Sequence, residues 1–283
     1  MPNSLVKPYL KWAGGKRQLL PEIENCLPQK FNSFKYYEPF VGAGAVFFKK
    51  QPKKAVINDY NTQLILTYKV IRGNINELIE ALMVHSQNNN AEYFYEIRAR
   101  DRDPDIFNAL SDIEKAARLI FLNKTCYNGL YRVNSQGLFN APYGRYTNPV
   151  ICDEPVLKAI HKYLSENEEV EIINGDFADA VQTVDDKAFV YFDPPYHSSD
   201  NTNFTGYQAD RFGDEEQTRL RDVFVHLTEV GAKCLLSNSD TDFIRELYSD
   251  SRFEIKSVSA KRAINSDGAG RGNVNEVLIK NWK

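Results

Sequence analysis

The alternation of short apolar runs with helical patterns constrains the fold of this chain more than any other feature. Residues 35–40 (KYYEPF) have the composition of a buried strand, and residues 41–50 (VGAGAVFFKK) lead through a glycine turn into a helical pattern. A second strand is predicted over 53–59 (KKAVIND) and a second helix over 61–71 (NTQLILTYKVI). Strands that alternate with helices form parallel sheets, so the sequence predicts an α/β fold.

The alternation is interrupted between residues 74 and 152. The periodicity is helical to about residue 123, and the Asn-, Gly-, Tyr- and Arg-rich stretch that follows predicts a hairpin turning at 134–137. Afterwards the α/β pattern returns, with strands predicted at 169–175, 187–193, 232–239, 252–260 and 274–282 and helices at 214–230 and 241–250. We therefore expect residues 1–73 and 153–283 to form one sheet domain, with 74–152 as an insertion.

Composition narrows the class of protein. Hydrophobic residues make up 42% of the 283, which is ample for a buried core. We see no apolar run near the roughly 20 residues of a membrane helix and no signal peptide, so we expect no membrane partner. The four cysteines and four histidines are scattered, without a C-x-x-C pair. We predict no disulfide framework, no metal site and a cytoplasmic location.

Charge is distributed unevenly. The net charge is −3, yet residues 115–152 contain five basic residues and no acidic one, and residues 1–21 contain four basic residues and no acidic one. Such segments indicate an anionic partner, such as a nucleic-acid backbone. The alternative is chance clustering on a solvated face.

A first ligand site is predicted at the ends of the early strands. Gly42 and Gly44 let the backbone approach a ligand closely, although tight turns also use glycine for packing alone. Asp59 ends the second strand, where a carboxylate can accept both hydroxyls of a ribose. Asp176 can accept from an adenine amine, and Phe177 can lie against the purine face.

The ligand that fits these residues has a ribose and an adenine but no phosphate. The chain contains no G-x-x-x-x-G-K-[ST] phosphate loop. S-adenosylmethionine (AdoMet), with S-adenosylhomocysteine as its product, meets this description. Lys16 can pair with its carboxylate, and Trp12 can form an apolar wall.

A second site is predicted where the strand over 187–193 ends in Asp-Pro-Pro-Tyr. Prolines cannot donate to a strand ladder, so the strand ends with acceptors only. Asp193 and the Pro194 carbonyl can accept the two N–H bonds of an exocyclic amine and localise its lone pair for attack on a methyl group. Tyr196 can stack on a base that has left the duplex. The alternative is a Pro-Pro turn with a buried tyrosine.

Seven motifs occur in an order that resembles one family. They are LKWAGGK, EPFVGAG, INDYN, YNGLYR, FNAPYGRY, DPPY and LSNS. The chain resembles, from about Tyr9 to its end, the Dam-type DNA adenine N6-methyltransferases of the alpha group, including modification enzymes that protect GATC. The resemblance implies a Rossmann-like AdoMet-dependent methyltransferase sheet with an inserted helical and β-hairpin DNA-recognition domain. It adds Glu38 and Phe40 to the cofactor site, and Glu38 departs from the family's usual Asp.

The resemblance also implies how double-stranded DNA is read. Arg132 would contact the guanine of the outer G·C pair of GATC, and a bidentate arginine–guanine contact supports this role. Leu130 and Pro142 would make apolar contacts, and Asn128 would contact a base edge or fill the space of an extruded base. Lys11 would touch the guanine at the other end of the site.

Phosphate contacts complete the expected DNA interface. These contacts set register without carrying sequence information. The residues expected to make them are Arg118, Asn134, Asn140, Arg145 and Tyr146. The alternative for each is a solvated or turn-capping side chain, and Asn134 in particular is placed to form the hairpin turn.

Two further segments and several partners are expected. Residues 197–212 are predicted to order over the flipped adenine through Phe204 and Tyr207, and Arg262 is predicted to line the entry of the base pocket. We expect a monomer that is either part of a restriction-modification system, with a cognate restriction endonuclease as a possible partner, or an orphan or viral Dam-type enzyme. The rival classes are protein or RNA methyltransferases, which most often carry Asn at the Asp193 position, and a non-catalytic DNA-binding protein on a methyltransferase fold.

Overall fold

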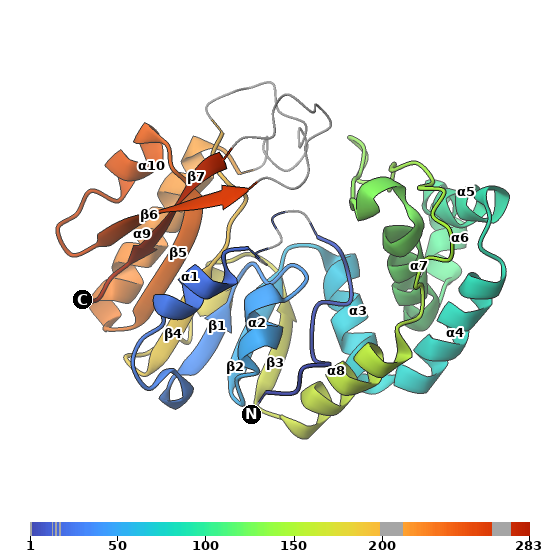
Figure 1. Ribbon diagram of the computed structural model, residues 1–283, viewed down its shortest axis with the longest axis horizontal. Coiled ribbons are helices and arrows are strands. Elements are labelled where there is room, and N and C mark those ends of the chain that lie inside the picture. The colour runs from blue at the N-terminus through green and yellow to red at the C-terminus, as the bar shows by residue number, and fades with distance from the viewer. Residues whose placement is uncertain (1, 13, 15, 17, 199–211, 262–272) are drawn as a thin grey trace. The chain divides into compact units, whose positions relative to one another are not determined.

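The computed structural model describes all residues except 1, 13, 15, 17, 199–211 and 262–272 (Figure 1). The described residues form a seven-stranded sheet with strand order β3-β2-β1-β4-β5-β7-β6. Strand β1 (Lys35–Glu38) pairs in parallel with β2 (Ala55–Asp59) and with β4 (Ala188–Phe192), and β4 pairs in parallel with β5 (Lys233–Ser239). The predicted Rossmann-like α/β sheet is confirmed.

The chain divides into two compact units. One consists of residues 16–40, 54–57 and 176–283. It contains β1, β4 and β5, the antiparallel strands β6 (Glu254–Lys261) and β7 (Asn273–Lys280), and the helices α1 (Leu20–Asn25), α9 (Asp214–Val230) and α10 (Asp242–Leu247). Short 3-10 turns lie at Phe31–Ser33 and Asp179–Val181. We call this part the corner unit, because it contains the D-P-P-Y corner.

The other unit consists of residues 1–15, 41–53 and 58–175. Its helices are α2 (Ala45–Lys50), α3 (Thr62–Gly73), α4 (Ile75–Gln87), α5 (Ala91–Ala99), α6 (Pro104–Ala109), α7 (Asp112–Thr125) and α8 (Glu154–Glu166), and its strand β3 is Val170–Asn174. Short 3-10 turns lie at Arg100–Arg102 and Tyr127–Gly129. We call this part the helical unit.

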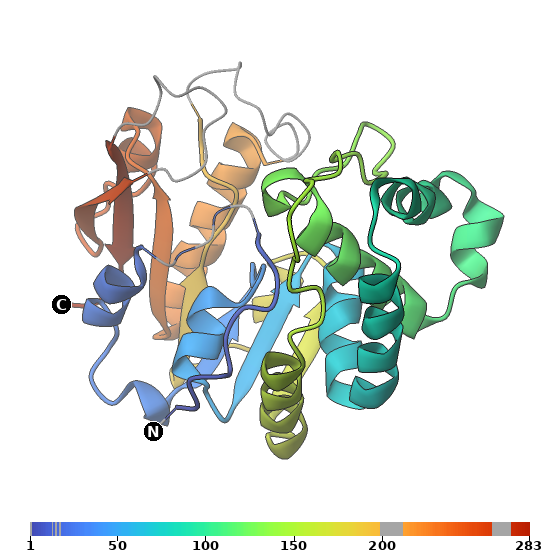
Figure 2. The ribbon, with the colours of Figure 1, turned by 45° about the vertical axis from the view of Figure 1, so that its right-hand side comes forward.

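Helix α7 is the centre of the helical unit. It begins with a capping box, in which the Ser111 hydroxyl accepts from the Glu114 N–H and the Glu114 carboxylate accepts from the Ser111 N–H. Its residues from Ala116 to Asn123 are buried, and it packs against α3 and α4 (Figures 1 and 2). The segment that follows α7 therefore starts from a rigid base.

The hairpin predicted at 134–137 is present in reduced form. Val133 and Phe139 form an isolated antiparallel bridge, and the Asn134 N–H donates to the Leu138 carbonyl. Gly137 has a φ of +77°, a conformation that favours glycine. A second bridge joins Cys126 to Tyr143 and closes the longer loop.

Two helices were not predicted from the sequence, α1 and α8. The buried face of α8 includes Val156, Ile160 and Leu164, which recur at helical spacing. Over the residues that the structure describes, no helix is long and apolar enough to cross a membrane.

Candidate active site

The D-P-P-Y corner follows the end of β4 in the corner unit. Asp193 lies directly after the buried strand, and its Oδ1 accepts a hydrogen bond of 3.0 Å from the Ser237 hydroxyl of β5. The Lys16 ammonium lies 2.8 Å from the same oxygen, and the side chains of Lys16 and Asp193 are only 6% and 17% exposed. The same ammonium lies 4.2 Å from the centre of the Tyr196 ring.

The pKa of Asp193 depends on two opposing effects, its burial and the donors that contact it. Burial raises the pKa of Asp193, and Lys16 and the Ser237 hydroxyl act in the opposite direction. The Tyr196 hydroxyl donates to Glu276 Oε2 at 2.7 Å, and burial followed by the Asp193 charge raises the pKa of Tyr196 well above its usual value. Tyr196 is therefore a neutral ring beside a carboxylate. Pro194, which lies between Asp193 and Tyr196 in the sequence, is buried.

Lys16 has a counter-ion within the protein. In the structure its ammonium pairs with Asp193, and the predicted pairing with the cofactor's carboxylate stays a prediction. The Lys16 ammonium donates to the Asp193 carboxylate, as the amine of a substrate base is expected to do. It also lies over the Tyr196 ring, where the substrate base is expected to stack. The corner thus accepts an N–H donor and a flat or cationic group together.

A cluster of aromatic rings lies next to Asp176 in the corner unit. The rings of Phe40 and Phe177 stack at 5.3 Å with an interplanar angle of 28°, and Phe212 contacts both. Arg219 of α9 forms an ion pair with Asp176, and its guanidinium lies 4.5 Å from the centre of the Phe177 ring. This cluster joins two residues predicted to bind adenine.

Arg219 determines the charge state of Asp176. Burial alone would raise the pKa of Asp176, but hydrogen bonds from Arg219 and from the Ala178 N–H outweigh it and hold the pKa below its usual value. Asp176 is therefore an ionised acceptor, as an adenine amine requires. No pattern in the sequence indicated Arg219, because its partner is distant along the chain.

The glycine turn and the end of β2 are joined in the helical unit. Asp59 Oδ2 accepts from the Gly42 N–H at 3.0 Å, and Oδ1 accepts from the Asn61 N–H at 2.9 Å. Gly42 and Gly44 have φ angles of +50° and +73°. Burial raises the pKa of Asp59 to about 6, against the two backbone donors. The turn places a carboxylate beside backbone in a conformation that L-residues rarely adopt.

Trp12 and Glu38, both predicted to bind the cofactor, belong to different units. A Cβ added at Gly42 would lie 3.1 Å from Trp12 Cδ1, so the indole packs directly on the turn. Glu38 is only 2% exposed, and its carboxylate accepts from the Tyr36 hydroxyl at 2.6 Å. The carboxylate at this position is held within the corner unit.

The N-terminal segment and the YNGLYR segment are bound together in the helical unit. Asn123 of α7 accepts from the Lys11 N–H at 3.0 Å and donates to the carbonyls of Lys11 and Gly129. The Trp12 and Tyr131 rings stack at 4.7 Å. Lys11, predicted to reach one end of the DNA site, is therefore fixed beside the segment predicted to reach the other.

Two of the predicted DNA contacts bind each other. Arg132 donates from Nε to the Asn140 side chain at 2.8 Å and from a terminal nitrogen to the Asn140 carbonyl at 3.2 Å. Asn134 Oδ1 accepts from the N–H groups of Gln136 and Leu138, which is the turn-forming alternative. Arg132 is exposed and oriented across the hairpin.

The other predicted contacts are accessible to different degrees. Asn128, Pro142, Arg145 and Tyr146 are exposed and Leu130 is half-buried. Tyr127, which was not predicted to contact DNA, is 60% exposed and precedes Asn128, whose φ is +58°. The sequence signal for it was an aromatic residue within the basic, acid-free segment 115–152.

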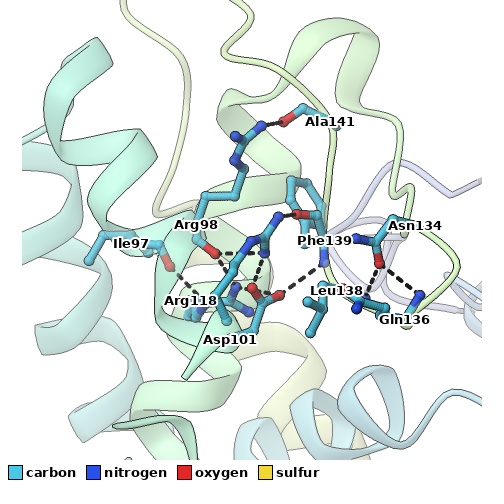
Figure 3. Close-up of polar contacts among 10 residues, drawn as sticks. Ile97, Arg98, Asp101, Arg118, Asn134, Gln136, Leu138, Phe139 and Ala141 are labelled. Atoms are coloured by element: carbon cyan, nitrogen blue, oxygen red, sulfur yellow. Dashed lines mark hydrogen bonds and ion pairs between the residues drawn. The ribbon is translucent and has the colours of Figure 1, made fainter. Parts of the chain in front are cut away.

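The predicted phosphate contact of Arg118 is wrong. Arg118 is only 2% exposed, and its guanidinium forms an ion pair of 2.8 Å with Asp101 (Figure 3). It also donates to the carbonyls of Ile97 and Arg98 at 2.9 Å. A buried cation must be paired, and here the pairing is internal, so Arg118 holds α5 against α7.

Some predicted site residues lie outside the described part of the chain. These are Phe204, Tyr207 and Arg262, together with most of the segment after the corner. Across the described part of the chain, no group of three or more His, Cys, Asp or Glu side chains could hold a metal ion.

The Rossmann-like sheet, the glycine turn after β1 and the acceptor-rich corner after β4 define the class of AdoMet-dependent amino-methyltransferases. The family described as D12 class N6 adenine-specific DNA methyltransferase matches residues 12–264, and the chain belongs to this family. The predicted class is confirmed: the protein is an adenine-specific DNA methyltransferase, and membership implies the use of AdoMet.

Curated relatives match over nearly their whole length. The chain is 44% identical over 278 residues to the Type II methyltransferase M1.LlaDCHI of Lactococcus lactis subsp. cremoris, with 98% of this chain and 96% of that protein covered. It is 45% identical over 294 residues to the Type II methyltransferase M.MjaIII of Methanocaldococcus jannaschii, with 98% and 99% covered. It is 34% identical over 274 residues to the DNA adenine methylase of Escherichia coli K12, with 95% and 93% covered.

Proposed function

We propose that the protein methylates the N6 amine of an adenine rotated out of double-stranded GATC, as a modification enzyme paired with a restriction endonuclease. The observation that carries this proposal is the Asp193 carboxylate, whose Oδ1 is held by Lys16 and Ser237 beside the Tyr196 ring. The names of the relatives support DNA adenine as the substrate and a Type II methyltransferase role, since some are called Type II methyltransferases and one a DNA adenine methylase.

The chemistry of the corner follows from its lack of N–H groups. Asp193 and the Pro194 carbonyl accept the two N–H bonds of the amine, which localises the nitrogen lone pair. The same acceptors stabilise the positive charge that develops on the nitrogen during attack. Tyr196 packs against the extruded base, which must leave the duplex to be reached. AdoMet, when bound, supplies a methyl group on a positively charged sulfur.

The residues proposed to hold AdoMet fit its chemical groups. Asp59 beside the glycine turn is an acceptor for ribose hydroxyls, and the ionised Asp176 with the rings of Phe40 and Phe177 suits an adenine. The remaining members of the proposed site are Trp12, Lys16, Glu38, Gly42, Gly44 and Asp193. A Cβ at Gly44 would lie 2.8 Å from the Tyr68 hydroxyl, so the turn tolerates no larger residue.

The DNA interface is proposed on the helical unit. Arg132 reads an outer guanine, Lys11 the guanine at the other end, and Leu130 and Pro142 make apolar contacts. Asn140 keeps the Arg132 guanidinium in place, as their two hydrogen bonds support. Further contacts are proposed for Tyr127, Asn128, Arg145 and Tyr146. Residues 74–152 are thus proposed as the recognition domain, and a monomer suffices because a palindrome can be methylated one strand at a time.

Labelled AdoMet and paired duplexes test the proposal. One duplex contains GATC and the other differs only at the outer G·C pairs, and the product is digested to identify the methylated nucleoside. We expect 6-methyladenine in the GATC duplex alone, and none with Asp193→Ala. Methyladenine in both duplexes would reject GATC as the target and still support methylation of the adenine N6 amine. Transfer to neither duplex, but to RNA or protein, would reject the proposal.

A further inference from the structure

The LSNS motif ends β5 with polar residues that are fully buried. Ser237 and Asn238 are 0% exposed and Ser239 is 7% exposed. Strand β5 pairs in parallel with β4 up to Phe192 and Leu236, so the next residues of β5 run beside the D-P-P-Y corner. Burying polar side chains is costly unless they are hydrogen-bonded, so their partners indicate why they are there.

Ser237 forms a chain of hydrogen bonds that ends on the Asp193 carboxylate. Its hydroxyl lies 3.0 Å from the Tyr191 hydroxyl and donates to Asp193 Oδ1 at 3.0 Å. Since Ser237 donates to Asp193, the Tyr191 hydroxyl donates to Ser237. Lys16 also binds Oδ1. The carboxylate is thus fixed through this oxygen by two donors.

Asn238 and Gln217 fix the backbone of the corner. Asn238 Oδ1 accepts from the His197 N–H at 3.0 Å, and its amide donates to Gln217 Oε1 at 3.0 Å. Gln217, from α9 and 0% exposed, donates in turn to the Pro195 carbonyl at 2.9 Å. The two prolines of the corner have no N–H groups with which to form such bonds. The constraint therefore comes from neighbouring elements.

We propose that Ser237, Asn238 and Gln217 form a buried frame of positioning residues, which orients the acceptors of the D-P-P-Y corner for methyl transfer. This inference rests on the proposed function of the corner. Acceptors held in place before the substrate arrives need not reorganise during the reaction, so loosening them slows chemistry. Among the described residues, the side-chain hydrogen bonds of the frame reach one proposed cofactor residue, Asp193, so its loss is expected to spare AdoMet binding.

The pH dependence of the reaction gives a signature of the frame. The Ser237 hydroxyl favours the ionised form of Asp193, so its removal moves the pKa of that carboxyl further up. Activity that needs the carboxylate is then lost at a higher pH on the acidic side. The other titratable groups at the corner and its frame, among the described residues, are Lys16, Tyr191, Tyr196, Glu38, Glu276 and His197 with its partner Asp214.

The first test uses Ser237→Ala in the full-length protein, with single-turnover methyl transfer to a GATC duplex and AdoMet affinity from calorimetry. We expect transfer about 10- to 100-fold slower near pH 7, from the loss of one hydrogen bond to a charged group. We expect AdoMet affinity within about twofold and an acidic limb displaced to higher pH. A rate within about twofold of the native enzyme, or an undisplaced limb, would overturn the proposal.

The second test uses Gln217→Met, which keeps the side-chain length and removes the amide. Gln182→Met is the matched control, because Gln182 is exposed and bonds only to Asp179 through its side chain. We expect a slower kcat with little change in the KM for AdoMet, and no effect in the control. Equal effects in the two variants would count against the frame. Native enzyme that forms no 6-methyladenine would instead reject the function on which the inference rests.

Discussion

The buried ion pair of Arg118 and Asp101 separates a structural arginine from one that binds DNA. Arg118→Met removes the charge and keeps much of the apolar stem. Removing one partner of a buried pair costs about 3–5 kcal/mol, because the other charge is left buried. Asp101 keeps Arg102 and the Phe139 N–H as partners, so we expect the lower end, about 3 kcal/mol. Urea unfolding followed by circular dichroism measures this loss.

The matched control is Arg100→Met, which changes the residue directly before Asp101. Arg100 pairs with Glu96 at 3.1 Å on the surface, where the two side chains are 32% and 62% exposed. Exposed pairs at this spacing contribute about 0.3–0.5 kcal/mol, so this variant is expected to unfold close to the native midpoint.

DNA binding supplies the result that would refute the reasoning. A phosphate contact contributes about 0.9 to the slope of log K against log salt concentration. Because Arg118 is internal, we expect Arg118→Met to leave this slope unchanged under conditions where the variant is folded. A slope reduced by about 0.9 together with unchanged stability would show that Arg118 binds phosphate.

Three more predictions follow from the turn and the aromatic cluster. Burial raises the pKa of Asp59 to about 6, so its contribution to stability is present at low pH and is lost as the pH rises through about 6. The urea midpoint of the native protein should therefore fall relative to that of Asp59→Asn as the pH rises. A difference between the two midpoints that stays constant with pH would contradict this. Arg219→Met should raise the KM for AdoMet about 3- to 10-fold with kcat unchanged, whereas Arg221→Met on the same helix should change neither. Gly44→Ala should lower stability by about 1–3 kcal/mol, since φ is +73° and its Cβ would meet side chains of α2 and α3, while Gly73→Ala, with open space around it, should not.

The sheet was predictable because its signals are local. The apolar run of β4 followed by two prolines specifies a buried strand and its end, and glycines at positive φ specify the turn before α2. The position of β7 between β5 and β6 was not predictable, because strand order depends on pairing between distant segments. Helix α8 was not predicted, although Val156, Ile160 and Leu164 recur at helical spacing. The sequence between residues 152 and 169 was assigned neither a helix nor a strand.

The site was predictable as a set of acceptors, and less so as a set of supports. Asp193 could be selected from its prolines alone, whereas its partner Ser237 and the Gln217 amide depend on which elements pack together. Arg118 shows the opposite error. A basic residue in an acid-free segment looks available for phosphate, and only the fold reveals that Asp101, outside that segment, has already paired with it.

The central pair of strands has a consequence for how this enzyme folds. Tyr36 of β1 is the register partner of Phe189 of β4, so direct neighbours in the sheet are separated by more than half of the chain. Contacts between such distant residues form slowly, because the loop must close before they stabilise anything. During synthesis the pairing of β1 with β4 must wait until β4 has emerged, while the pairing of β1 with β2 and the local contacts of α3, α4 and α7 can form first. The surface proposed to read DNA would then acquire its structure before the corner that modifies it.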